Sequence, residues 1–213
     1  LTENLRAYSP SYSPDGKLIC FVVNKDGTLN LQIADADGTN NDPITAFGNG
    51  EQVYNPKFEP GGKKIIFDYS YEDSRKLAEI DIETGKMNIV LEEKGVDYRN
   101  PVFSKDGSKL YFASNKTGVF NVYSYNTESK EVKQITNVTG GAFMPNTDTA
   151  GNLTYSTYTS GGYKIALLKN YSEKDPAIVG SYEKPDALIK KYASVDSVST
   201  SNEYDWIKLK NFN

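Results

Sequence analysis

The densest group of potential metal ligands is the acidic segment Asp35-Ala36-Asp37-Gly38-Thr39-Asn40-Asn41-Asp42. Carboxylate and amide oxygens are the ligands that Ca²⁺ prefers in proteins. However, the segment lacks the spacing and the closing Glu of an EF-hand loop. It also falls where one expected strand must turn into the next. We therefore interpret it as a hairpin or Asx turn, and we predict no metal site in the chain.

Few side chains in this sequence could support nucleophilic or acid–base catalysis. The chain contains no His, which excludes Ser-His and Cys-His nucleophile pairs and every His-ligated metal site. Its one cysteine, Cys20, lies in the apolar run 18–23 and is interpreted as a small buried residue. Asp15 and Asp106 each precede a Gly in a predicted turn, which explains them better than acid–base chemistry does. We predict that the chain is not an enzyme and needs no cofactor.

The composition narrows the class of partner. The 213 residues carry a formal net charge of −4, and the basic residues are scattered among more numerous acidic ones. A nucleic-acid partner would require clustered Lys and Arg, so we predict none. No apolar stretch approaches the roughly 20 residues that a membrane-spanning helix needs, so we predict no direct membrane insertion. The 16 Tyr and 9 Phe residues favour strands, because aromatic side chains fit half-buried pleated surfaces.

A motif recurs four times along the chain. It begins at Pro10, Pro56, Pro101 and Pro145, at spacings of 46, 45 and 44 residues. The copies read PSYSPDGKLICF, PKFEPGGKKIIF, PVFSKDGSKLYF and, more weakly, PNTDTAGNLTYS. Near-equal periods with one motif indicate a repeat architecture.

The third copy shows most clearly what one repeat contains. Strands are expected at 101–103, 109–113, 120–125 and 132–136, and Asp106-Gly107 makes a tight turn between the first two. Four short antiparallel strands in about 45 residues are typical of a β-propeller blade. We therefore predict an all-β chain with four propeller blades of four antiparallel strands each. The blades are expected at about 1–47, 48–93, 94–138 and 139–170.

Bulky residues recur at two fixed places in the motif. The place two residues after the proline holds Tyr12, Phe58, Phe103 and Thr147, and the place eleven residues after it holds Phe21, Phe67, Phe112 and Ser156. A blade cannot bury its faces alone, so these side chains are expected to pack between neighbouring blades. By this count the fourth blade has lost both aromatic residues, which indicates a blade at a boundary or one beside an unusual neighbour.

The turn of the first copy, Ser13-Pro14-Asp15-Gly16-Lys17, resembles the hallmark of the TolB-like propeller repeat. The turn is altered at 59–63 and 104–108 and nearly lost in the fourth copy, and the resemblance covers about residues 1–170. The stretches 117–123 and 134–145 are also similar to the propellers of large secreted bacterial proteins that carry a C-terminal outer-membrane barrel. This resemblance implies a periplasmic or outer-membrane-associated location.

Both ends of the repeat array lead to further expectations. Leu1-Thr2 matches Ile135-Thr136, the end of an outermost strand, so a blade is expected to precede the chain. The resemblance implies a ring of about six blades, which makes the chain an open arc whose free faces could self-associate. Residues 171–213 are interpreted as a C-terminal extension or linker, or alternatively as a strap across a blade. Within them, 177–179 could complete the last blade, and 186–192 could form helical turns.

The residues that enter each blade are the best candidates for contact with a partner. In a propeller the first strand lines the central channel, and its entry loop lies on the face that usually binds partners. The candidates are Tyr8, Tyr54, Asn55, Arg99, Asn100 and Phe143. Aromatic residues and Arg suit a protein interface, and the loops at 25–27, 71–75, 115–117 and 160–162 are expected on the same face. In the alternative interpretation, these residues only pack the channel wall.

Three functions remain compatible with the sequence. The first is a non-catalytic protein–protein interaction or scaffold propeller of a bacterial envelope or secreted protein, whose partner the sequence does not identify. The second is a substrate-gating propeller of a peptidase whose catalytic domain lies outside this chain. The third is a carbohydrate-binding propeller, which the high Tyr content favours.

Overall fold

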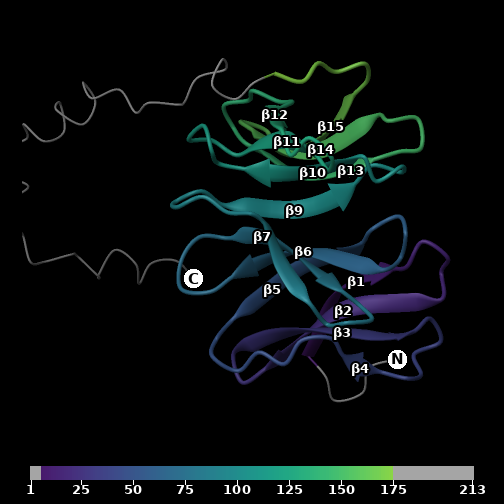
Figure 1. Cartoon of the computed structure of the whole chain (residues 1–213). Helices are drawn as coiled ribbons and strands as arrows, with labels where there is room; N and C mark the ends of the chain where they lie inside the picture. The colour runs from purple at the N-terminus through teal and green to yellow at the C-terminus, as the bar shows by residue number, and fades with distance from the viewer. Residues whose placement is uncertain (1–5, 175–213) are drawn as a thin grey trace, which may run out of the picture. The chain divides into compact units, whose positions relative to one another are not determined.

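The computed structural model describes residues 6–174 (Figure 1). Residues 6–174 form strands and no helix, so this part of the chain has no helix that could cross a membrane. The strands are β1 (Arg6–Tyr12), β2 (Leu18–Lys25), β3 (Thr28–Asp35), β4 (Asp42–Pro43), β5 (Gln52–Phe58), β6 (Lys64–Ser70), β7 (Lys76–Asp81), β8 (Met87–Leu91), β9 (Tyr98–Phe103), β10 (Lys109–Ser114), β11 (Asn121–Asn126), β12 (Val132–Gln134), β13 (Ala142–Thr147), β14 (Leu153–Thr159) and β15 (Gly162–Leu168).

These strands form four antiparallel sheets in chain order, which confirms the predicted all-β fold with four propeller blades. Blade one is β1-β2-β3-β4, blade two is β5-β6-β7-β8 and blade three is β9-β10-β11-β12. The first strands of successive blades are neighbours: β1 lies against β5, β5 against β9 and β9 against β13. Figure 1 shows the blades following one another from purple to green.

Blade four departs from the prediction of four strands per blade. Within the described residues it has three strands, β13-β14-β15. After β15 the chain crosses to blade three, where Lys174 forms an antiparallel bridge with Gln134 of β12. The Tyr171 hydroxyl donates to the Tyr111 hydroxyl at 2.8 Å, so residues 171–174 lie along blade three. The expected fourth strand at 177–179 and the helical turns at 186–192 fall outside the described residues.

In blades one and three, Ser and Asp side chains hold the tight turn between the first two strands. In blade one the Ser13 hydroxyl donates to Asp15 Oδ1 at 2.7 Å, and the Leu18 N–H donates to Ser13 Oγ at 2.9 Å. The intervening Gly16 has a φ of +73°, a conformation in which Gly has no Cβ penalty. Asp106 has the same role in blade three, where Ser104 and Ser108 donate to it and lower its pKa to about 2. The interpretation of both Asp residues as turn residues is confirmed.

Apolar clusters fill the three joints between the blades. Leu31 of blade one packs in one cluster with Phe67 of blade two, and Ile66 of blade two packs in the next with Phe112 of blade three. Both Phe side chains are fully buried, and burying one contributes about 2–3 kcal/mol. Cys20 is also fully buried, and burial raises its pKa to about 12, which confirms its interpretation as a core residue.

The aromatic register predicted for blade four is wrong by one residue. Leu153 pairs with Thr147 as Leu110 pairs with Phe103, so Tyr155, and not Ser156, is equivalent to Phe112. The physical reason is a turn one residue shorter in blade four. Tyr155 is buried against blade three in one cluster with Tyr111, so blade four has kept one of its two aromatic residues. Thr147 does replace the other, as the sequence indicates.

The face of blade four that points away from blade three is apolar and exposed. Its large side chains are Tyr158, Tyr163, Ile165 and Leu167. In blades one to three the equivalent face is buried against the following blade. An open blade face is therefore present at blade four within the described residues, and self-association through it stays a prediction.

Candidate partner-binding face

The predicted partner-binding residues occupy one repeated place within the innermost strands β1, β5, β9 and β13, and not in the entry loops where the sequence interpretation placed them. Tyr8, Tyr54, Arg99 and Phe143 are equivalent, because they pair with equivalent positions of the second strands: Val22, Asp68, Ala113 and Ser156. Each is followed by a residue in the left-handed region, with φ between 49° and 55°, and by a shift in strand register. The innermost strand of every blade is therefore bulged at this place, which re-aims the side chains beside it. We call this end of the four strands the entry face.

The left-handed residues explain why Asn recurs at the entry face. They are Ser9, Asn55, Asn100 and Met144. Asn adopts this conformation more readily than most non-Gly residues do, so Asn55 and Asn100 have a backbone reason to be there. Met144 has no such reason, and its side chain is 66% exposed. An exposed, flexible thioether is a common feature of protein-binding surfaces.

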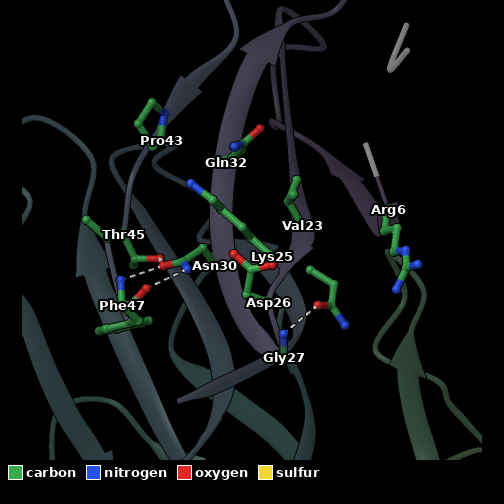
Figure 2. A pocket seen from close by; sticks show the side chains of 12 residues that line it. Arg6, Val23, Lys25, Asp26, Gly27, Asn30, Gln32, Pro43, Thr45 and Phe47 are labelled. Carbon is green, nitrogen blue, oxygen red and sulfur yellow. Dashed lines mark hydrogen bonds between the residues drawn. The ribbon is translucent and has the colours of Figure 1, made fainter. Parts of the chain in front are cut away.

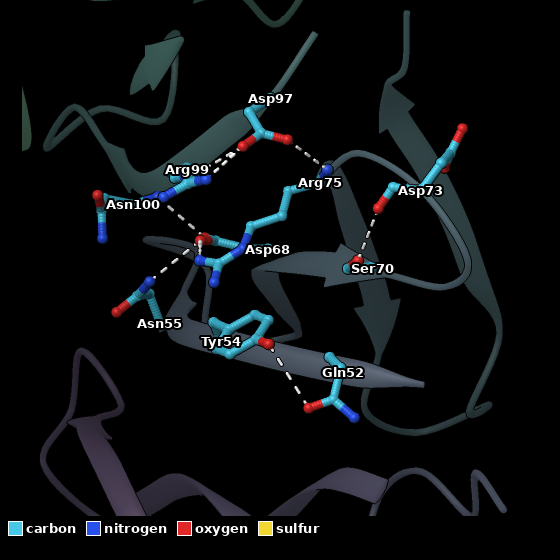
Figure 3. A network of polar contacts seen from close by, with 10 residues as sticks. All are labelled: Gln52, Tyr54, Asn55, Asp68, Ser70, Asp73, Arg75, Asp97, Arg99 and Asn100. Atoms are coloured by element: carbon cyan, nitrogen blue, oxygen red, sulfur yellow. Dashed lines mark hydrogen bonds and ion pairs between the residues drawn. The ribbon is translucent and has the colours of Figure 1, made fainter. Parts of the chain in front are cut away.

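The side chains of the entry face stack on one another. The Arg75 guanidinium, which comes from the loop between β6 and β7, lies 3.8 Å from the ring centre of Tyr54 (Figure 3). The Arg99 guanidinium lies 4.8 Å from the ring centre of Phe120, whose ring is 5.3 Å from that of Phe143. In blade two the contact brings Arg75 of the predicted 71–75 loop against the innermost strand. In blade three the contact is made by Phe120, which lies outside the predicted loop 115–117. Stacking of this kind fixes the rotamers of long side chains.

Asp68 is a fully buried carboxylate at the joint between blades two and three. Its oxygens accept hydrogen bonds from the Asn55 side chain at 3.1 Å and from the Asn100 backbone N–H at 2.9 Å. Arg75 Nη1 lies 3.5 Å from Asp68 Oδ2, which makes an ion pair (Figure 3). Burial raises the pKa of Asp68 to about 7, against the opposing effects of Asn55, Arg75 and Asn100. Asn55 and Asn100 therefore serve this joint as well as the entry face.

Asp97 joins the two arginines on the solvent side of Asp68. One of its oxygens accepts the Arg75 backbone N–H at 2.9 Å, and the other forms an ion pair with Arg99. Burial alone would raise the pKa of Asp97, but the hydrogen bond from Arg75 and the charge of Arg99 outweigh it and lower that pKa. The result is a network of two carboxylates and two guanidiniums that links β6, β9 and the β6–β7 loop (Figure 3).

Sequence reasoning missed Asp68 and Asp97 and did not single out Arg75 within the 71–75 loop. Asp68 follows Ile65-Ile66-Phe67 directly, and a charged residue inside a run of buried strand residues was a usable signal. Its ion pair with Arg75 could not be read from the sequence, because it depends on how the β6–β7 loop folds back over the sheet.

A hollow of about 340 Å³ lies between the innermost strands of blades two to four. Asn55 and Lys57 of β5 face Asn100 and Val102 of β9 across it, and Met144 of β13 completes the wall. Three Asn, two Pro, one Lys, one Val and one Met line it, a set that can bind polar or apolar groups but holds no pair of nucleophile and general base. The entry face is thus suited to recognition.

A second hollow, of about 730 Å³, lies on the outer side of blade one (Figure 2). Its wall includes a hydrogen-bonded set in which Thr45 Oγ1 donates to Asn30 Oδ1 at 2.8 Å and the Phe47 N–H donates to the same oxygen at 2.7 Å. Arg6, Lys25 and Gln32 also line it. The Asn30–Thr45 contact holds the end of blade one in place, so this wall has a structural reason to be polar.

The acidic segment 35–42 folds as a turn. Asp37 Oδ1 accepts the Thr39 N–H at 2.9 Å, and Asp35 Oδ2 accepts the Asn40 amide at 2.6 Å. These carboxylate oxygens are used within the turn, as expected from the Asx-turn interpretation. Among residues 6–174, no group of three or more acidic or Cys side chains is arranged to hold a metal ion.

Solved structures with the same fold come from several classes of protein. TolB from Acinetobacter baumannii is 23% identical with a TM-score of 0.69, over 82% of this chain and 44% of that one. A putative TolB from Agrobacterium tumefaciens is 18% identical with a TM-score of 0.68, over 78% of this chain and 64% of that one. A puromycin-hydrolyzing peptidase from Mycobacterium tuberculosis is 16% identical with a TM-score of 0.61, over 85% of this chain and 32% of its own. At these identities the likeness concerns the fold, and the chain spans less than two thirds of either TolB.

The amino-acid sequence also matches a protein family. The family described as the TolB beta propeller domain matches residues 7–183, which include all four copies of the repeat. The predicted resemblance to TolB-like propellers is thereby confirmed. Because the match covers well over half of the sequence, the chain belongs to the TolB beta propeller domain family.

Proposed function

We propose that this chain is a non-catalytic protein-binding or scaffold module of a bacterial envelope or secreted protein, and that a partner protein docks on its entry face. The observation that supports this proposal is a pair of stacks near the hollow between the innermost strands: Arg75 on Tyr54, and Arg99 on Phe120 beside Phe143. Aromatic and Arg side chains dominate binding energy at protein interfaces. Here they are held before a partner arrives, which lowers the entropy that binding costs.

The two arginines suggest which kind of surface docks there. Asp68 and Asp97 already form ion pairs with them, so these two guanidiniums attract an acidic partner less than free cations would. A strongly acidic partner would gain little from them. The stacked rings and the exposed Met144 favour a partner that inserts an apolar or aromatic side chain into the hollow. A periplasmic or outer-membrane-associated location, by resemblance to the family, is part of this proposal.

Site-specific photocrosslinking tests the proposal. Benzoylphenylalanine replaces Met144 on the entry face in one variant, and in a matched variant it replaces Tyr12, which is similarly exposed at the opposite end of an innermost strand. With an envelope extract, we expect a discrete adduct from position 144 that excess unlabelled chain removes, and none from position 12. Equal labelling at both positions, or no competition by unlabelled chain, would contradict docking on the entry face.

A gating role beside a peptidase domain is the second candidate. It is favoured by the shared fold with the puromycin-hydrolyzing peptidase, of which this chain covers 32%. It makes a different prediction, because the entry face would then contact a hydrolase domain of the same protein. Crosslinking from position 144 to a segment of the parent polypeptide would support gating, and crosslinking to a separate protein would support a scaffold role. A carbohydrate-binding role would instead appear as glycan binding that Tyr54→Ala weakens.

A further inference from the structure

The outer edge of β15 is a strand edge with no partner among residues 6–174. In blades one to three the third strand pairs with a fourth, outermost strand: β3 with β4, β7 with β8 and β11 with β12. Among the described residues β15 pairs with β14 alone. The chain that follows β15 crosses to blade three instead, through the bridge between Lys174 and Gln134. An unpaired edge of this length can accept a further strand.

One repeated position shows what the missing strand would cover. Strand pairing makes Leu31, Leu77, Val122 and Ile165 equivalent, since they pair with Val22, Asp68, Ala113 and Ser156. The first three are 0% exposed, whereas Ile165 is 85% exposed. Ile165 is therefore the centre of an apolar strand whose outer edge and outer face are not covered by any other part of residues 6–174.

In blades one and three, the same pair of fourth-strand residues bonds the backbone at this position. In blade one the Ile44 N–H donates to the Leu31 carbonyl at 2.9 Å, and the Leu31 N–H donates to Thr45 Oγ1 at 2.9 Å. Thr45 then bonds Asn30, the residue before Leu31. Ile135, Thr136 and Asn121 repeat these contacts around Val122 in blade three, at 2.9, 2.8 and 2.9 Å. An Asn on the third strand thus goes with an Ile-Thr pair on the fourth.

Blade two uses a different, charged pair at the same place. Its third strand has Lys76 where the other two blades have Asn, and Leu91 of β8 pairs with Leu77. The residue after Leu91 is Glu92, and its carboxylate lies 2.5 Å from Lys76 Nζ. The Glu92 hydrogen bond raises the pKa of Lys76. A Lys on the third strand thus goes with a Leu-Glu pair on the fourth.

Blade four has Lys, and not Asn, before its central residue. Lys164 precedes Ile165 as Lys76 precedes Leu77. We propose that the outer edge of β15 binds an extended strand of a partner protein, in which an aliphatic residue faces Ile165 and the acidic residue after it pairs with Lys164. This surface lies on the outermost side of blade four, so it is separate from the entry face and does not depend on the function proposed for that face.

The chain itself supplies a probe for this edge. A labelled peptide of residues 86–93, Lys-Met-Asn-Ile-Val-Leu-Glu-Glu, has the sequence of β8 with its Leu91-Glu92 pair. We expect saturable binding to the full chain by fluorescence anisotropy. A peptide with Leu91→Pro should bind at least about tenfold more weakly, because Pro cannot donate to the strand ladder. A peptide with Glu92→Lys should bind about two- to fivefold more weakly, as expected for one exposed ion pair.

A charge swap in the protein isolates the predicted contact. The Lys164→Glu variant should lose affinity for the original peptide and regain it for the Glu92→Lys peptide, while Lys169→Glu, just beyond β15, serves as the matched control. Unchanged circular dichroism would show that both variants fold. The proposal is overturned if no peptide binds, if Lys169→Glu has the same effect as Lys164→Glu, or if the swapped pair does not recover. Protection of the Ile165 amide from hydrogen exchange in the free chain would also overturn it, because the edge would then be occupied already.

Discussion

Equivalent strand positions are buried at the joint between blades two and three and exposed on the outer side of blade four. At the joint, Leu77 and the side chains around it are fully buried, and the charged Asp68 is enclosed with them. On blade four, Ile165 stands at the position of Leu77 and is exposed. Apolar character along these strands therefore does not by itself indicate burial. What decides burial is whether another blade or a fourth strand lies against the position.

The largest expected difference between the two regions is the cost of removing a large side chain. Phe112 is fully buried and stacks on Tyr123 at a ring distance of 5.8 Å, so Phe112→Ala should lower the free energy of unfolding by about 3–5 kcal/mol. Ile165→Ala should change it by less than about 0.5 kcal/mol, because an exposed side chain leaves no cavity. Urea denaturation of both variants checks the pair. A large loss for Ile165→Ala would mean that the face of blade four is covered in solution.

The sequence was a good guide to the features that depend on local pattern. The 44–46-residue period, the Asp15-Gly16 turn and the burial of Phe67 follow from turn chemistry and strand alternation, which act over a few residues. It also indicated that the residues before each repeat proline are equivalent, and they share one backbone conformation. Partner binding by their neighbours stays a prediction.

Two features could not be predicted in the same way. Assigning Ser156 to the aromatic place failed because counting from Pro145 does not detect a turn one residue shorter, and only strand pairing reveals Tyr155 as the equivalent residue. The crossing of residues 171–174 to blade three depends on contacts such as Lys109 with Glu173, far apart in the sequence. The first feature is a local change of turn length that a fixed count hides, whereas the second depends on interactions between distant segments.

The pH dependence of stability sharpens the comparison at the Asp68 joint. Burial raises the pKa of Asp68 in the folded chain to about 7, whereas an unfolded Asp titrates near 3.9. Between these values the folded state holds a proton that the unfolded state has released, so the stability contributed by this residue falls as the pH rises. Asp68→Asn removes the titration. We expect the stability of the natural chain relative to Asp68→Asn to fall by on the order of 2 kcal/mol between about pH 5 and pH 7.

Thermal or urea unfolding across that pH range measures the difference directly. Asp15→Asn is the matched control, because Asp15 lies in an exposed turn and hydrogen bonds from Ser13 and Lys17 lower its pKa. Its relative stability should not fall over this interval. If the natural chain instead gained stability relative to Asp68→Asn as the pH rises, the ion pair with Arg75 would outweigh burial. The joint would then be a salt bridge across the whole range.

The smallest expected effect tests whether Lys76 and Lys164 are equivalent in chemistry as well as in position. A double-mutant cycle with Lys76→Ala and Glu92→Ala should give a coupling energy of about 0.2–1 kcal/mol, because the carboxylate is half exposed. In the same assay Lys164→Ala should leave the free energy of unfolding of the free chain unchanged. It should lower that free energy by a similar amount only when the peptide of residues 86–93 is bound. A coupling energy of zero between Lys76 and Glu92 would mean that the pairing of a third-strand Lys with a fourth-strand Glu does not select the strand bound at the β15 edge. The open edge could then still accept a strand, but its sequence would be set by the apolar contact with Ile165 alone.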